Sequence, residues 1–428
     1  MNAGGRLYAD GGVDNKGPVV FWVYAAAFKL FGLYNLTAVH LFKVAVVLAT
    51  AGVVALIAKR LYGFHAAWIA ALLYVAFTAA GYPKLAAANT EVLMMLPLSA
   101  SFLLLLDRRW AAAGALLALA CMTKQVAVLQ LALFPLAGVL LTRDWRPVLA
   151  GGAGFAAGLA VLLAAVAATG SLSGWWHWTV ASVLTGYGPS AWSGGQLAGS
   201  IAGGLVPWLE AAVGLLLAAL AGLRRSQPLL AGWLATATLG ALAGGHFFGH
   251  YFIEIVGPAA VLAVGFLAEW RWAARRPLAA ALATGALALP AVLFTAGDYS
   301  VDVVPRSPVE AYVAAHTQPG EHIFVWGNSP EVYLYSDRLP ATRFPGFLRG
   351  FPRASGARPV NWDLNVNVWI DVVHDFEAHR PALIVDTSTA DWQSFGAYPM
   401  SRFPLQVLVA SWYEKAAVVD GVTIYRLR

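Results

Sequence analysis

The sequence contains little charge, since only 12% of its 428 residues are Asp, Glu, Lys or Arg. A soluble globular protein carries about twice that fraction, which excludes a water-soluble fold for most of the chain. Cys121 is the only cysteine, so an intrachain disulfide is excluded as well. The chain also lacks a Walker loop, a GxGxxG turn, a CxxC pair and a GxSxG elbow. Nucleotide-driven transport and soluble-type hydrolase chemistry therefore have no support.

Apolar residues are abundant instead, at 59% of the chain, and the mean hydropathy is +0.65. Runs long enough to cross a hydrocarbon layer of about 30 Å recur from residue 37 to residue 297. Residues 110–141 are interpreted as two short helices that meet at Lys124, because a single helix of that length would extend about 48 Å. The pattern predicts about ten spans, at 37–58, 64–81, 91–106, 110–123, 125–141, 147–168, 201–223, 228–245, 251–268 and 277–297.

Basic residues stand in twos and threes between the apolar runs, which is typical of membrane topology and not of nucleic-acid binding. Alternate connections collect Lys59, Arg60, Arg108, Arg109, Arg143, Arg146, Arg224, Arg225, Arg271, Arg275 and Arg276, and the opposite side collects Arg6, Lys16, Lys84 and Lys124. By the positive-inside rule, the first group faces the cytoplasm. We therefore expect a multi-pass protein of the cell membrane whose N-terminal segment and C-terminal region lie outside the cytoplasm.

The chain divides into three expected segments. Residues 1–36 form an outer loop and a helix from Pro18 onward that lies in the membrane interface or, alternatively, re-enters the membrane. Residues 37–297 form the transmembrane helical domain. Residues 298–428 predict a small extracytoplasmic α/β domain. Its strand patterns lie at 322–327, 381–388 and 422–427, and its helical patterns lie at 309–317 and 371–380.

Two groups of polar residues lie early in the chain on the expected outer side. The first comprises Asp10, Asp14 and Lys16. A carboxylate of this group could act as a general base and the lysine could bind a phosphate, or all three residues belong to a solvated loop. The second comprises Lys84, Asn89 and Glu91, at the mouth of two spans. Glu91 either hydrogen-bonds sugar hydroxyls or caps the helix that follows, since Asn89 is a good N-cap residue and acids favour a helix N-terminus.

Two further groups lie later in the chain. Lys124, at a break between apolar helices, needs an anionic partner or a wet cavity, unless its side chain snorkels to the surface. The stretch GGHFFGHYFIE contains His250, Tyr251 and Glu254. His250 and Glu254 have the i, i+4 spacing of a metal pair, but no third ligand is evident, so no metal ligand is assigned. A divalent metal stays open as a hypothesis, and no other cofactor is expected.

The chain resembles the polytopic GT-C glycosyltransferases, which include the protein O-mannosyltransferases and the lipid A aminoarabinose transferase, and in particular the bacterial branch with the RgtA/B/C/D-like domain. The resemblance rests on the stretches 4–32, 87–97, 247–258 and 325–344. It implies a GT-C-like fold and an enzyme that transfers a sugar from a polyprenyl-phosphate donor to a lipid, glycan or protein acceptor at the outer membrane face. The other implied partners are membrane lipids, and nucleic acid is not among them.

The family pattern also implies roles for individual residues. Asp14, Lys16 and Pro18 match a D-x-K-x-P-like stretch, in which the lysine lies near the carrier phosphate, and Asp10 lies in the same loop. Asp14 and Asp10 are the predicted catalytic residues. The predicted substrate-binding residues are Lys16, Lys84, Asn89, Glu91, Lys124, His250 and Tyr251.

One departure from the family concerns the start of the chain. These proteins usually begin with a first span and an acidic Asp-Glu pair that precede the equivalent of Asp10, and this sequence starts after that point. Two hypotheses follow, a start codon placed too late or the loss of the usual catalytic aspartate. The alternatives to a transferase are a non-catalytic descendant that binds lipid-linked sugars and a transporter or flippase, although no inverted repeats are found.

Overall fold

The computed structural model describes residues 5–79, 89–186, 194–224, 227–268, 285, 289, 306–345 and 366–428. Its contacts divide the chain into two compact units. The helical unit comprises Asn15–Ala168 and Thr179–Asp302. The mixed unit comprises Met1–Asp14, Thr169–Trp178 and Val303–Arg428. Each unit is described by itself.

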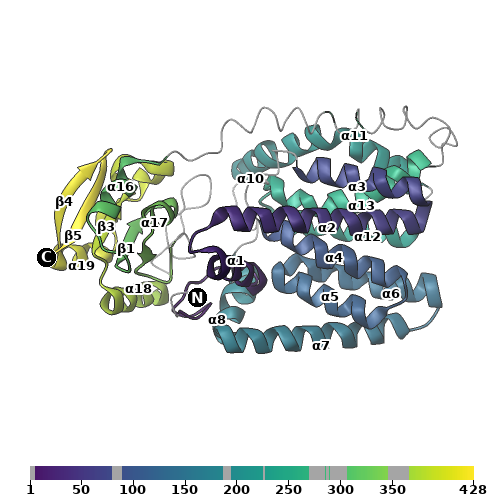
Figure 1. Ribbon diagram of the computed structural model, residues 1–428, viewed down its shortest axis with the longest axis horizontal. Helices are drawn as coiled ribbons and strands as arrows, with labels where there is room; N and C mark the ends of the chain where they lie inside the picture. The colour runs from purple at the N-terminus through teal and green to yellow at the C-terminus, as the bar shows by residue number, and fades with distance from the viewer. Residues whose placement is uncertain are drawn as a thin grey trace. The chain divides into compact units, whose positions relative to one another are not determined.

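The helical unit consists of apolar helices (Figure 1). In lipid, helices satisfy all of their backbone hydrogen bonds internally, which is why runs of Ala, Leu and Val adopt this form. The helices are α1 (Pro18–Phe31), α2 (Leu36–Tyr62), α3 (Phe64–Ala79), α4 (Thr90–Leu106), α5 (Trp110–Thr123), η1 (Gln125–Ala132), α6 (Leu133–Ala137), η2 (Gly138–Thr142), α7 (Arg146–Thr169), η3 (Trp176–Ala181), α9 (Ser182–Gly186), α10 (Gly194–Ser200), η5 (Ile201–Leu205), α11 (Val206–Leu223), α12 (Pro228–Ala243), η6 (Gly249–Phe252) and α13 (Ile253–Ala268).

Five helical segments among the described residues are long and apolar enough to cross a membrane. They are Leu36–Tyr62, Gln125–Thr142, Arg146–Thr169, Leu197–Leu223 and Gly249–Leu267, and shorter apolar helices lie at Pro18–Phe31, Phe64–Ala79, Thr90–Leu106, Trp110–Thr123 and Pro228–Ala243. This set confirms the predicted polytopic helical fold. The predicted span at 277–297 lies outside the described residues, apart from two positions.

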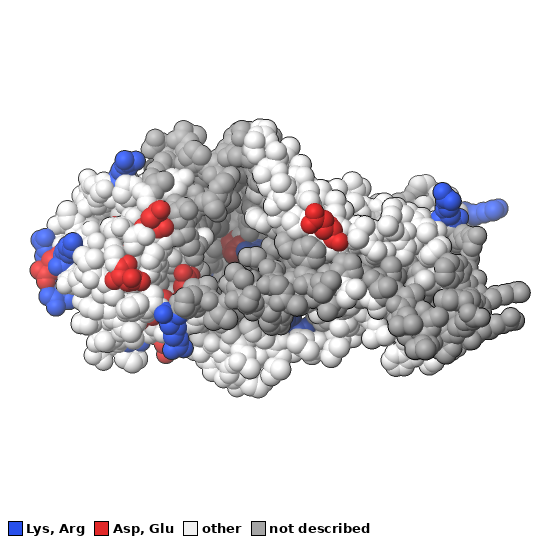
Figure 2. All heavy atoms as spheres, turned by 90° about the horizontal axis from the view of Figure 1, so that it is seen from above, with Lys and Arg blue, Asp and Glu red and all other residues white. Residues whose placement is uncertain are grey.

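Burial separates the central helix of this unit from a peripheral one. α13 contacts α2, α3, α11 and α12. In the segment Gly249–Leu267, which contains most of α13, 83% of the most apolar stretch is buried. The most apolar stretch of α7 has a mean hydropathy of 2.1, but only 11% of this stretch is buried. An apolar helix that is exposed in this way needs an apolar solvent. Figure 2 shows a different face of the helical unit, on which few of the described residues are charged.

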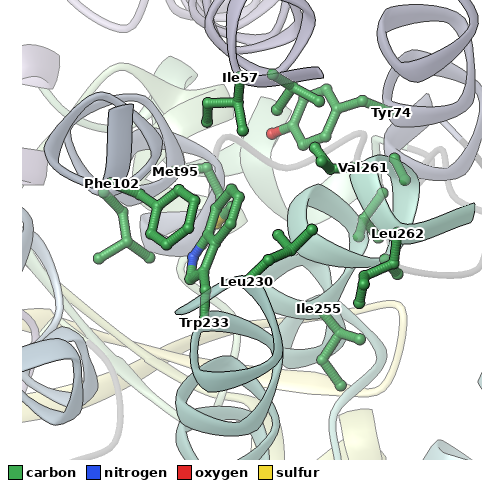
Figure 3. Packing of buried hydrophobic residues seen from close by; sticks show 14 of the residues in the cluster. Ile57, Tyr74, Met95, Phe102, Leu230, Trp233, Ile255, Val261 and Leu262 are labelled. Carbon is green, nitrogen blue, oxygen red and sulfur yellow. The ribbon is translucent and has the colours of Figure 1, made fainter. Parts of the chain in front are cut away.

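The core of the helical unit is packed around large side chains from several helices (Figure 3). Phe102 of α4 stacks on Trp233 of α12, with 4.3 Å between the ring centres. Tyr74 of α3 and Ile57 of α2 are fully buried in the same cluster. These contacts join helices that are distant in sequence, and they fix the framework that holds the polar residues described below.

The mixed unit is built on a five-stranded sheet of order β2-β1-β3-β5-β4. β1 is parallel to β2 and β3, whereas β5 is antiparallel to β3 and β4. The strands are β1 (His322–Trp326), β2 (Leu339–Pro340), β3 (Leu383–Asp386), β4 (Tyr413–Val419) and β5 (Val422–Leu427). The helices are α8 (Leu172–Trp175), α16 (Pro308–Ala315), α17 (Glu331–Ser336), α18 (Val366–His379), η8 (Thr387–Ala390), η9 (Trp392–Ala397), η10 (Met400–Arg402) and α19 (Leu405–Trp412).

Segments far apart in sequence are joined within the mixed unit. The amide of Leu7 donates to the carbonyl of Thr169 at 3.2 Å, and the amide of Ser171 donates to the carbonyl of Leu7 at 3.0 Å. The amide of Val13 donates to the carbonyl of Arg343 at 3.1 Å. These backbone bonds group the first fourteen residues with the C-terminal sheet domain.

Candidate active site

A break in the helical path positions Lys124. α5 ends at Thr123, Lys124 has an extended backbone with φ −150° and ψ 128°, and η1 begins with Gln125. Only 14% of the Lys124 side chain is exposed, and its ammonium nitrogen lies 3.7 Å from the centre of the Tyr251 ring. Such a cation is attracted to the face of the ring, but in an apolar surrounding it also needs an anion.

Glu91 supplies that anion. The Lys124 Nζ donates to Oε1 of Glu91 at 2.5 Å, and the Glu91 side chain is 2% exposed. The hydroxyl of Thr90 donates to the other carboxylate oxygen at 2.8 Å. An ion pair, and not snorkelling, therefore accounts for Lys124. Asn89 is the N-cap residue of α4 but makes no side-chain cap hydrogen bond, and Glu91 lies in the first turn of α4, where an acid also favours the helix N-terminus.

His250 and Tyr251 border the same ion pair. Both lie in η6, directly before α13. The Nε2 of His250 is 3.7 Å from Oε1 of Glu91. The ring of His250 stacks on Phe248 and meets Tyr251 edge to face, with ring centres 5.7 and 4.9 Å apart. Tyr251 and His250 thus place aromatic rings against the two sides of the pair, Tyr251 at Lys124 and His250 at Glu91.

Glu254 is the second carboxylate beside Lys124. It is 2% exposed, and its Oε1 lies 3.9 Å from the Lys124 Nζ. Within the described part of the chain this oxygen has no hydrogen-bond partner. Gly240 of α12 makes room for the carboxylate, because a Cβ at that position would approach Oε2 of Glu254 to 2.5 Å. We call Glu91, Lys124, His250, Tyr251 and Glu254 the Lys124 cluster.

Lys16 belongs to the same unit, and its neighbours contact the break at Lys124. The Nε2 of Gln125 donates to the carbonyl of Asn15 at 2.8 Å. A Cβ at Gly17 would overlap the backbone carbonyls of Met122 and Thr123, so the chain approaches the end of α5 closely at this glycine. The backbone on both sides of Lys16 is therefore held against the segment that carries Lys124.

Asp10 and Asp14 belong to the mixed unit. The amide of Arg6 donates to the Asp10 carboxylate at 2.6 Å, and this hydrogen bond, with the charges of Arg6 and Arg343, lowers the pKa of Asp10. Burial raises the pKa of Tyr8, and the negative charge of Asp14 raises it further. Asp14 thus lies near a buried phenol, whereas the Asp10 side chain is 55% exposed.

Lys84 and the possible metal pair His250 and Glu254 are the sequence predictions that remain to be compared with the structure. Lys84 lies outside the described residues. Across the part of the chain that the structure describes, no three His, Cys, Asp or Glu residues are placed to hold a metal ion. His250 and Glu254 each approach a member of the Glu91–Lys124 pair. The metal pair that their spacing indicates gains no third ligand among these residues.

The sequence predicts most residues of the Lys124 cluster, but it gives no binding or catalytic role to Glu254 or to the neighbouring Gln125. Glu254 was considered only as a metal partner of His250, although a carboxylate in an apolar run is a functional candidate by itself. Gln125, the neighbour of Lys124, is not a candidate from the sequence alone. Its amide also donates to the carbonyl of Thr179 at 2.9 Å, so it joins three segments of the helical unit.

Comparisons with known proteins agree with this architecture. Residues 15–171 match the family model of the dolichyl-phosphate-mannose-protein mannosyltransferases. A search of curated proteins by sequence found no match to this chain.

Two solved structures have a similar fold. The crystal structure of ArnT from Cupriavidus metallidurans bound to undecaprenyl phosphate has a TM-score of 0.60 and 17% identity, and the match covers 96% of this chain and 88% of that one. The archaeal oligosaccharyltransferase AglB from Archaeoglobus fulgidus, in complex with an inhibitory peptide and a dolichol-phosphate, has a TM-score of 0.53 and 12% identity. That match covers 97% of this chain and 66% of AglB. At these identities the likeness concerns the fold.

Proposed function

We propose that this chain is a polytopic membrane glycosyltransferase of the GT-C type and that it transfers a sugar from a polyprenyl-phosphate donor to an acceptor. The family match covers the segment that contains Lys16, Glu91 and Lys124. The fold is that of proteins solved with undecaprenyl phosphate and with a dolichol-phosphate. The acceptor that we propose is a lipid, a glycan or a protein.

The observation that carries the proposal is a lysine held between two carboxylates inside an apolar helical unit. Lys124 contacts Glu91, Glu254 and the Tyr251 ring, and the segment that carries it also holds the backbone around Lys16. Ammonium groups at such a place suit a phosphate with a long apolar tail, because the tail stays in lipid while the phosphate meets cations.

The proposed reaction needs a carboxylate base for the acceptor and cations for the leaving phosphate. An acceptor hydroxyl attacks the anomeric carbon, the bond from that carbon to the phosphate oxygen breaks, and the hydroxyl proton passes to a carboxylate base. Asp14 is our candidate for the base. Lys124 and Lys16 stabilise the negative charge that develops on the leaving phosphate. Glu91, His250 and Tyr251 keep Lys124 in place, and Lys84 and Asn89 remain candidates for binding the substrate.

We also propose the orientation that the basic residues indicate. The chain is a multi-pass membrane protein, with residues 37–297 as its membrane domain. Residues 1–36 and 298–428 lie outside the cytoplasm in this proposal, because the connections rich in Lys and Arg lie on the opposite side. The sugar is then transferred at the outer face, where the lipid-linked donor supplies its own activation.

The experiment measures binding of polyprenyl phosphate to the purified full chain in lipid nanodiscs. Removing Lys124 alone leaves Glu91 buried and unpaired, which itself destabilises the fold by about 3 kcal/mol. The test variant therefore carries Lys124→Met together with Glu91→Gln and Glu254→Gln, so that neither buried carboxylate is left without its cation. We expect it to fold and to bind the lipid phosphate about 10- to 100-fold more weakly, as the loss of one charge-assisted hydrogen bond predicts.

Two controls accompany this test. Lys124→Arg retains the cation and should keep most of the affinity. Lys59→Met removes an exposed lysine from the last turn of α2 and should leave the affinity unchanged. Transfer from a radiolabelled polyprenyl-phosphate sugar is measured on the same samples. Wild-type affinity and turnover in the triple variant would overturn the proposal, and lipid binding without any transfer in the wild type would identify a non-catalytic relative.

A further inference from the structure

The mixed unit contains a pocket of ≈ 800 Å³ to which the proposed reaction assigns no role. Its lining comes from the end of β3, from η8 and η10, from α19, and from β4 and β5. The volume lies in the range of sites that bind small molecules and exceeds what an ion requires. All of the lining residues belong to the mixed unit, so the pocket is complete within it.

Asp386 and Tyr425 both line the pocket. β3 pairs with β5 in a register that sets Ile384 opposite Tyr425 and Asp386 opposite Thr423. Because side chains alternate along a strand, Asp386 and Tyr425 project from the same face of the sheet. Burial, and then the charge of Asp386, raise the pKa of Tyr425, which agrees with this proximity.

Asp386 is a buried acid at a position where open α/β sheets bind ligands. It is the last residue of β3, and β3 is parallel to β1. Ligand sites in such sheets gather beyond the carboxyl ends of the strands. The amide and hydroxyl of Ser388 both donate to its Oδ1. Asp386 therefore has a fixed orientation at the wall of the pocket.

The lining of the pocket offers hydrogen bonds without an excess of either charge. Asp386 and Glu414 are its acids, and Lys415 and Arg428 are its bases, so the formal charges cancel. A phosphate or an acidic peptide would need an excess of bases. A purely apolar ligand would desolvate the Asp386 carboxylate without giving it a hydrogen bond, which is unfavourable.

We propose that this pocket binds a neutral saccharide and, on the basis of the proposed function, that this saccharide is part of the acceptor. A sugar ring presents hydroxyl groups that donate and accept hydrogen bonds, and these match a carboxylate and a set of serine hydroxyls. Its apolar face suits an aromatic ring, which Tyr425 supplies. The sheet domain is then the part of the enzyme that selects the acceptor.

The test measures saturation-transfer NMR from the full chain in nanodiscs to free glucose, galactose, mannose and N-acetylglucosamine. Ala410 of α19 lines the pocket and is exposed, so Ala410→Trp fills the space without disturbing the core. Asp386→Asn removes the carboxylate charge, and Asp420→Asn is the matched control at an exposed turn outside the pocket. We expect transfer to at least one sugar in the wild type and in Asp420→Asn, and a loss of about tenfold in affinity in Ala410→Trp.

The outcomes separate this inference from the proposed function. Absence of saturation transfer to all four sugars, or equal transfer in Ala410→Trp, would overturn the saccharide assignment even if Asp386→Asn fails to fold. Displacement of the sugar by inorganic phosphate would overturn it as well, since the pocket would then be an anion site. Polyprenyl phosphate binding is measured on the same wild-type sample. Its absence would overturn the proposed function and leave the saccharide assignment in place.

Discussion

Glu91 and Glu254 face the same lysine, but their hydrogen bonding differs. Glu91 accepts hydrogen bonds from Lys124 and Thr90, whereas Oε1 of Glu254 has no hydrogen-bond partner within the described residues. A buried charge without hydrogen bonds is costly, and breaking a buried ion pair is more costly still. We therefore expect Glu91→Gln to destabilise the protein by about 3 kcal/mol and Glu254→Gln to leave its stability unchanged or raised. Thermal unfolding in detergent compares the two, and equal losses would contradict this account of the cluster.

The two N-terminal carboxylates are distinguished by their surroundings. The pKa of Asp10 is lowered by the Arg6 amide, so Asp10 is a weaker base than a free carboxylate. We expect Asp14→Asn to reduce sugar transfer by about 100-fold or more and to leave membrane insertion unaffected. Asp10→Asn should reduce transfer by less than about tenfold. Turnover of a radiolabelled polyprenyl-phosphate sugar gives both numbers, and the reverse order would assign the base to Asp10.

The sequence anticipated which residue types matter in the helical unit, but not how they pair. Lys124, Glu91 and His250 are visible as ionisable residues in apolar runs, so each is a candidate from the sequence alone. That Glu91 meets Lys124 depends on the packing of α4 against α5, which no local pattern encodes. The i, i+4 spacing of His250 and Glu254 suggested a shared ligand, but His250 lies in the 3-10 helix η6 and Glu254 lies in α13, so the two residues do not share one regular α-helical face.

At the scale of single elements, α7 packs against α5 through glycine. A Cβ at Gly154 would overlap the carbonyl of Ala111 in α5, whereas a Cβ at Gly152 finds no atom within 4 Å. Gly154→Ala should therefore force the helices apart and destabilise the protein by about 1–3 kcal/mol. Gly152→Ala on the same helix should stabilise it by up to about 1 kcal/mol, because alanine is the better helix former. Thermal unfolding in detergent is the measurement, and a harmless Gly154→Ala would contradict this packing.

The end of β3 gives a prediction about pH. Burial raises the pKa of Asp386, although Ser388 donates two hydrogen bonds that act in the opposite direction. As the pH rises, the unfolded chain loses this proton first, so the contribution of Asp386 to stability is most favourable below its unfolded pKa of about 3.9. It is lost as the pH rises through the folded pKa.

Local opening of β3, followed by amide hydrogen exchange, tests this sign. We expect the free energy of opening to fall as the pH rises above about 4, and to fall more strongly in the wild type than in Asp386→Asn. Asp420→Asn, at an exposed turn, should follow the wild type. Parallel profiles for all three proteins would show that Asp386 does not titrate with a raised pKa.

Elements of the helical unit were the most predictable part of the fold. The expected span at 37–58 corresponds to α2 at Leu36–Tyr62, and the expected span at 110–123 coincides with α5. In the mixed unit, the pattern at 422–427 coincides with β5. β4 was not anticipated, because Tyr413–Val419 carries no clear alternation and its exposed positions alternate only partly with buried ones. Its place at the sheet edge depends on pairing with β5, which is a property of the folded unit.

On the scale of the whole molecule, the division into two units depends on pairings that sequence patterns do not contain. The first fourteen residues read as an isolated outer loop, but Leu7 bonds to Thr169 and Ser171, and Val13 bonds to Arg343. These are backbone hydrogen bonds, so side-chain chemistry gives little indication of them. The fold as a whole was nevertheless predictable, because hydropathy identifies membrane helices and alternation identifies strands.

The orientation of the whole chain is the last prediction, and it depends on the uneven distribution of Lys and Arg among the connections. Cys121 is the only cysteine, so Cys121→Ala provides a background in which single cysteines report accessibility. We expect Asp420→Cys, in the sheet domain, to react with a membrane-impermeant maleimide in intact cells. Asp144→Cys lies between η2 and α7, next to Arg143 and Arg146, and should react only after the cells are opened. The opposite pattern would place the sheet domain in the cytoplasm. The positive-inside rule would then be wrong for this chain, and sugar transfer at the outer face and the proposed acceptor site would be contradicted as well.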